Sequence, residues 1–127
     1  MRNVREQILK LHNYSESDLI EFMKNDLKID NQKNEVANIK CIALVPGKTP
    51  IEDVYYVKYT TPRGNVLFTR FRMDENGKLL PFDENSNGFD NVLYSSKAMA
   101  EFRQAHGGEY DTPKKGLMKM WVVWGGY

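Results

Sequence analysis

VYYVKYTTPRGNVLFTRFRM, residues 54–73, is the stretch that decides the fold of this chain. Two runs rich in Tyr, Val, Phe and Thr, which are residue types that favour strands, flank the turn Thr61–Gly64. Pro at the second position of this turn and Gly at the fourth predict a type I turn followed by a left-handed glycine, the common three-residue hairpin loop. A two-residue loop would instead place Arg63 at positive φ, which is unfavourable for such a side chain.

The three-residue loop also fixes which side chains share a face of the hairpin. It predicts a nearly pure apolar face from three cross-strand pairs: Tyr55 with Phe71, Val57 with Thr69 and Tyr59 with Leu67. The opposite face then carries the pairs Val54 with Arg72, Tyr56 with Arg70 and Lys58 with Phe68. Because a slip of one residue would mix charged and apolar side chains on both faces, this clean separation favours the chosen register.

Helices and further strands are expected on both sides of the hairpin. Apolar residues at helical spacing, and a capping-box-like pair of Ser15 and Asp18, indicate two helices before it. In chain order, the other elements expected are helices over 4–11 and 15–27, a strand over 37–45, a short strand over 78–80, a helix from 95 or 96 to 105, and a strand over 117–124. The last strand is apolar on both faces, which is typical of a central or fully covered strand. The prediction is a single α+β domain over residues 1–127. Its antiparallel sheet of about four strands has helices packed on one face, in the order ααβββαβ.

Composition excludes several classes of protein. The chain has 127 residues, of which 41% are hydrophobic and 28% charged, as is typical of a soluble globular protein. Its longest apolar runs fall far short of the roughly 20 residues of a transmembrane helix, and no signal peptide is expected at Met1–Leu11. Cys41 is the single cysteine, so a reducing cytoplasm is the simplest location. A net charge of +1 argues against a domain built to coat nucleic acid.

The expected outward face of the hairpin is locally basic. Between Val54 and Met73 there are four basic residues and no acidic one, whereas Asp and Glu gather at 16–30 and 74–90. The candidate binding residues are Tyr56, Lys58, Arg63, Phe68, Arg70 and Arg72. Aromatic and cationic side chains of this kind stack on a partner and meet its carboxylates or phosphates. The alternative is a solvated sheet face on which Arg and Lys stems cover the rings.

No catalytic residue, metal site or cofactor is predicted. His12 and His106 both stand at predicted helix ends, where they suit the helix dipole, and Cys41 is expected to be a buried, inert thiol. Residues of the loop Asp83–Gly88 match the first positions of a calcium loop, but its twelfth position, which needs Glu, is Tyr94. Residues 46–49 resemble the tail of a phosphate-binding loop without its upstream glycine or its following helix.

Three hypotheses for function remain. The leading one is a non-enzymatic binding or regulatory module, including an inhibitory one, that engages another protein through the basic and aromatic face. The second is binding of single-stranded nucleic acid by the same face. The third is a small-molecule pocket or an enzyme with an unrecognised site. No membrane partner is expected. Trp121 and Trp124, on the final strand, belong to the core, to an exposed aromatic contact or to the seam of a homodimer.

Overall fold

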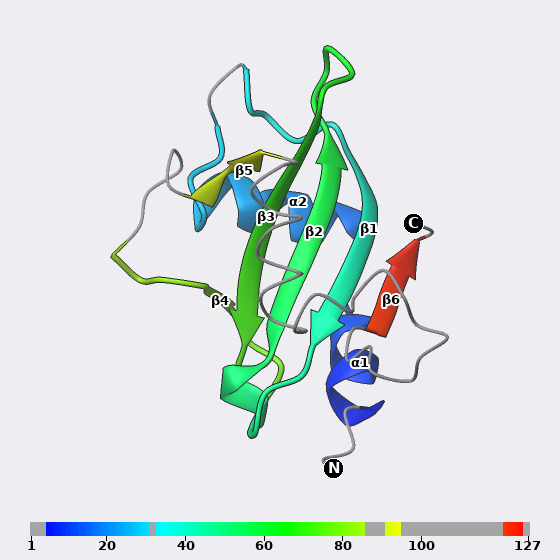
Figure 1. Ribbon diagram of the computed structural model, residues 1–127, viewed down its shortest axis with the longest axis vertical. Helices are drawn as coiled ribbons and strands as arrows, with labels where there is room; N and C mark the ends of the chain where they lie inside the picture. Colours follow the sequence, from blue (N-terminus) through cyan, green and yellow to red (C-terminus); the bar gives the residue numbers. More distant parts are fainter. Residues whose placement is uncertain (1–4, 31–32, 86–90, 95–120, 126–127) are drawn as a thin grey trace.

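The computed structural model describes residues 5–30, 33–85, 91–94 and 121–125, and it confirms the α+β class with an antiparallel sheet (Figure 1). Its elements are α1 (Arg5–Leu11), α2 (Glu16–Asn25), β1 (Asn38–Val45), the 3-10 helix η1 (Pro50–Glu52), β2 (Val54–Thr60), β3 (Val66–Met73), β4 (Leu79–Pro81), β5 (Leu93–Tyr94) and β6 (Trp121–Gly125). The helix predicted from residue 95 or 96 to 105 lies outside the described residues. Within those residues, α1 and α2 lack the length and apolar character that a membrane span requires.

The strands form one antiparallel sheet in the order β4-β3-β2-β1-β6, with β5 also paired to β3. The four longer strands β1, β2, β3 and β6 are those expected from the sequence, the short strand expected over 78–80 is β4, and β5 is an addition. Of the two alternatives expected for the final strand, central or fully covered, the central one was wrong, because β6 stands at the end of the strand order of the described residues, beside β1. Apolar residues on both sides of a strand predict that its faces are covered, and they do not determine how many strands flank it.

The register of the β2–β3 hairpin is the predicted one. The pairs Tyr55–Phe71, Val57–Thr69 and Tyr59–Leu67 alternate with Tyr56–Arg70 and Lys58–Phe68. The predicted pair of Val54 and Arg72 lies one position beyond this ladder.

The turn that sets this register has the expected glycine geometry. Gly64 has a φ of 86°, its N–H donates to the Thr61 carbonyl at 2.9 Å, and the Thr61 N–H donates to the Asn65 carbonyl at 2.9 Å. The turn is therefore the three-residue loop with a left-handed glycine.

The turn between β3 and β4 repeats the same geometry at the other end of β3. Gly77 has a φ of 88°, and its N–H donates to the Asp74 carbonyl at 3.0 Å. In each turn, the side chain of the first residue also accepts a hydrogen bond from the backbone N–H of the residue four positions later. The distance is 2.8 Å from the Lys78 N–H to Asp74 Oδ1 and 3.2 Å from the Asn65 N–H to Thr61 Oγ1.

Alanine in place of either turn glycine is expected to destabilise the fold. Because the left-handed conformation disfavours a Cβ atom, Gly64→Ala should cost about 1–2 kcal/mol. Gly77→Ala should cost more, because its Cβ would also lie 3.3 Å from the Lys10 Cβ, whereas nothing lies within 4 Å of a Cβ at Gly64. Urea denaturation of the two variants measures the difference. Equal losses would contradict the contact between α1 and this turn.

Both helices pack on the apolar face of the sheet, and α2 crosses behind the strands in Figure 1. The helix α2 begins as predicted, because Ser15 Oγ accepts from the Asp18 N–H at 3.1 Å and the Asp18 carboxylate accepts from the Ser15 N–H at 3.0 Å. Its buried side chains Leu19, Phe22 and Met23 join the core. The Phe71 ring stacks on Tyr55 at a centroid distance of 5.0 Å and meets Phe22 edge-on at 5.7 Å.

Side chains from α1 and its following turn hold the β3–β4 turn by its backbone carbonyls. Gln7 Nε2 donates to the Asp74 carbonyl at 3.2 Å, and the Tyr14 hydroxyl donates to the Gly77 carbonyl at 2.6 Å. Lys10 Nζ donates to the Glu75 carbonyl. These three bonds fasten one end of the β3 strand to the helical layer.

Candidate functional site

The structure brings the six candidate binding residues onto one hairpin, but it gives them different surroundings. Tyr56 and Arg70 are cross-strand neighbours, as are Lys58 and Phe68, on the face opposite the helical core. Arg63 lies in the turn between the two strands and is exposed. The register therefore places these side chains as the sequence indicates.

Tyr56 is buried, with 7% of its surface exposed, which corrects the expectation that its ring faces solvent. Its neighbours on β1 share this burial: Ala43, which is its cross-strand partner, is 2% exposed and Cys41 is 4% exposed. The period of a strand predicts the direction in which a side chain points, but not what covers that side of the sheet. This part of the face is therefore closed to a partner.

Arg70 and Arg72 are half-buried and engaged within the chain. The Arg70 guanidinium carbon lies 3.8 Å from the centroid of the Phe82 ring, a cation–π contact. Arg72 Nε donates to the Pro81 carbonyl at 3.4 Å. Both partners come from β4 or directly follow it, so these cations help to hold the segment after β4 against the sheet.

Replacing Arg70 by alanine is therefore expected to reduce stability. Loss of a half-buried cation–π contact and of the arginine stem should cost about 1 kcal/mol. Arg63→Ala removes the same charge from an exposed turn position and should stay within about 0.5 kcal/mol of the wild type. Thermal melting of the two variants compares them. An unchanged melting temperature for Arg70→Ala would show that its contact with Phe82 contributes nothing.

Lys58 and Arg63 differ from the other two cations of this hairpin in their side-chain contacts. In the part of the chain that the structure describes, neither side chain forms a hydrogen bond or an ion pair. Lys58 is half-buried beside the half-buried Phe68 ring, and Arg63 belongs to the run Pro62–Val66, whose five residues are all exposed. We call residues 62–66 the apex. Of the candidate hairpin residues, those not engaged within the described chain thus lie in the apex and at Lys58 and Phe68.

Cys41 is a buried free thiol, as the sequence predicts. Burial raises the pKa of Cys41, and the positive charge of Lys58 opposes that rise. A raised pKa reduces the fraction of thiolate, which is the form that reacts with electrophiles. Within the described residues no group of three His, Cys, Asp or Glu side chains is placed to hold a metal ion.

The shifted pKa of Cys41 gives a pH-dependent stability. Because the folded state favours the protonated thiol, this contribution is complete below the unfolded-state pKa of about 9 and is lost as the pH rises through the folded-state pKa. We expect the free energy of unfolding to fall less steeply above pH 9 in Cys41→Ala than in the wild type. Alkylation by iodoacetamide at pH 8 should also be slow until urea unfolds the chain. Fast labelling of the native protein would contradict the burial.

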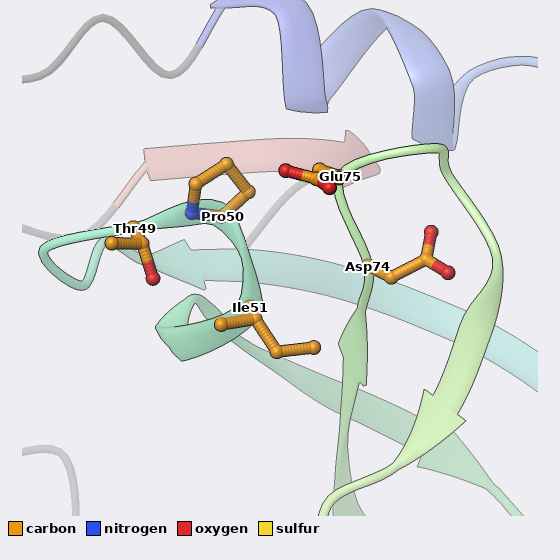
Figure 2. A pocket seen from close by; sticks show the side chains of 5 residues that line it. All are labelled: Thr49, Pro50, Ile51, Asp74 and Glu75. Carbon is orange, nitrogen blue, oxygen red and sulfur yellow. The ribbon is translucent and has the colours of Figure 1, made fainter.

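A small pocket lies between η1 and the β3–β4 turn, with a volume of about 230 Å³ (Figure 2). Thr49, Pro50, Ile51, Asp74 and Glu75 line it. Figure 2 shows the two carboxylates pointing in different directions, with Glu75 toward Pro50. Asp74 Oδ1 already accepts from two backbone N–H groups. The pocket therefore offers no converging set of groups for catalysis.

Two other sequence predictions fall partly or wholly outside the described residues. The loop Asp83–Gly88 is described only as far as Asn85, where the Asn85 N–H donates to Asp83 Oδ1 at 2.9 Å in an ordinary Asx turn. His106 lies outside the described ranges, and His12 is exposed just after α1.

Comparison with known proteins adds no functional assignment to this geometry. No protein-family model, no curated protein and no solved structure matches the chain. The inference of function therefore rests on the apex, Lys58 and Phe68.

Proposed function

We propose that this protein is a non-enzymatic binding module that engages another protein through the apex end of its β2–β3 hairpin. The observation that carries the proposal is the position of the apex, which projects past the other described elements at one end of the molecule (Figure 1). The binding surface consists of the apex residues 62–66 together with Lys58 and Phe68. Tyr56, Arg70 and Arg72 support this surface from within the chain.

The conformation of the apex favours binding, because little of its freedom remains to be lost. Gly64 and Asn65 are both tied to Thr61, by hydrogen bonds of 2.9 to 3.2 Å. Immobilising a flexible loop on association weakens affinity, whereas a loop already fixed in its bound form avoids that cost. The apex is also the longest run of consecutive exposed residues in the described ranges.

A capture experiment with matched charge variants tests the proposal. The tagged chain is incubated with extract of the organism that encodes it, beside Lys58→Glu/Arg63→Glu and the control Lys24→Glu/Lys78→Glu. Lys24 and Lys78 are exposed on α2 and next to β4, away from the apex, so the control makes the same change in net charge. We expect a protein captured by the wild type and the control, and at least tenfold less of it captured by the apex variant.

The same experiment separates the other hypotheses. Equal capture by all three chains would place the contact away from the apex and overturn the proposal. Nuclease-sensitive capture, or oligonucleotide binding that weakens with salt, would support single-stranded nucleic-acid binding in its place. Melting temperatures of the three chains show whether any loss of capture comes from loss of fold.

A further inference from the structure

We infer that the apex inserts into a recess of its protein partner, where the Arg63 guanidinium pairs with a carboxylate. This inference rests on the proposed function and adds to it the shape and the chemistry of the partner's site. The inference follows from three observations: the apex is narrow, the exposed Arg63 side chain has no bonding partner in the described part of the chain, and apolar residues of the apex lie near Arg63 in the sequence.

The concave shape of the partner's site follows from the fold of the hairpin. The apex is built on the three-residue turn Pro62–Gly64 that joins two strands, so it is only one hairpin wide, and no other described helix or strand extends as far at that end (Figure 1). A narrow projection buries a large fraction of its own surface only when the partner surrounds it on several sides. A concave site therefore gains more contact from the apex than a flat surface does.

The acidic chemistry of the partner's site follows from Arg63. Its guanidinium is the exposed cation of the apex and has no hydrogen-bonding or ionic partner in the described part of the chain. A guanidinium forms two parallel hydrogen bonds with a carboxylate, a geometry that gives specificity as well as affinity. Pro62 and Val66, of which Val66 is 42% exposed, add apolar contact on both sides. A recess that has a carboxylate for the Arg63 guanidinium and apolar walls for Pro62 and Val66 complements the apex.

The count of available cations disfavours nucleic acid as the partner. Among the cations of the hairpin, Arg70 and Arg72 are engaged with Phe82 and Pro81, which leaves Lys58 and Arg63 to meet phosphates on this face. Two phosphate contacts to a single strand give a salt dependence with a slope of only about −1.4, well below that of proteins that make 6–10 such contacts. At protein interfaces, by contrast, a few buried anchor residues carry most of the binding energy, and Arg is one of the residue types enriched among them.

Two measurements test the inference. First, a photo-crosslinking residue replaces Asn65 in one chain and Phe68 in another, and mass spectrometry locates the attached partner residues. We expect Asn65 to crosslink beside Asp or Glu residues of a protein. Second, the dissociation constant of that protein is measured for the wild type, Arg63→Lys and Arg63→Gln, with Lys24→Gln as the control.

We expect Arg63→Gln to weaken binding by at least tenfold, Arg63→Lys to lie between it and the wild type, and Lys24→Gln to bind as the wild type does. Unchanged binding by Arg63→Gln would overturn the insertion of Arg63. If Phe68 crosslinked and Asn65 did not, the proposed function would stand and the recess would not. Crosslinks to nucleic acid, or no crosslink from either position, would overturn both proposals.

Discussion

Replacement of Phe71 by alanine is expected to lower the free energy of unfolding by about 3–5 kcal/mol, the range found for buried phenylalanines. Phe71 is 1% exposed, and its ring contacts Tyr55 from the neighbouring strand and Phe22 from α2. The substitution therefore opens a cavity where the sheet meets the helical layer. Since small domains are stable by only about 5–15 kcal/mol, a large part of the stability would be lost.

The matched control for Phe71 is Phe68, which lies on the same strand and points to the opposite face. Phe68 is half-buried and outside the core cluster, so Phe68→Ala should cost less than half as much. Urea denaturation gives both values, provided that the slope of the transition stays constant. Equal losses for the two variants would mean that the helix-covered face is not the core of this domain.

Replacement of Asn91 by alanine is expected to cost about 1–3 kcal/mol, because it leaves a buried carbonyl without its donor. Asn91 is 6% exposed, and its Nδ2 donates to the Leu27 carbonyl at 2.9 Å, just after α2. Its own carbonyl accepts from Thr69 Oγ1 of β3 at 2.6 Å. One residue thus links the end of a helix to the centre of the sheet.

Thr69→Val tests the second half of this link. Valine keeps the shape of Thr69 but cannot donate, so a buried carbonyl again loses its partner, at a similar cost. Because both bonds hold the same residue, the double variant should lose less stability than the sum of the single losses. Strictly additive losses in urea denaturation would show that the two bonds act independently.

The hairpin could be predicted from the sequence because its information is local. Pro62 and Gly64 specify the turn, and the separation of apolar from charged residues specifies the register. The start of α2 is local in the same way, since Ser15 and Asp18 are three residues apart. Its end gave no such signal: Lys28 takes a positive φ of 58°, where glycine is usual, and the Ile29 N–H donates to the Met23 carbonyl at 3.0 Å.

The features that could not be predicted depend on contacts between distant segments. The register shift in β1 between Ile39 and Cys41 is visible only against its partner β2. The sequence predicts Arg70 as a binding residue, but it does not reveal that the Phe82 ring lies under the Arg70 guanidinium. A sequence-based assignment of a binding surface counts side chains of the right type, whereas the structure shows which of them are already occupied.

The pairing of the hairpin with its neighbouring strands has a mechanical consequence for the apex. The ribbon of β2 and β3 is hydrogen-bonded to β1 from Val54 to Thr60 and to β5 at Leu67 and Phe68, so only the apex extends beyond these supports. The part of a beam beyond its last support is a cantilever, whose deflection is greatest at the free end and whose bending moment is greatest at that support. A pull on Arg63 by a bound partner would therefore be resisted first at the pair of Thr60 and Val66 and then shared with β1 across the sheet.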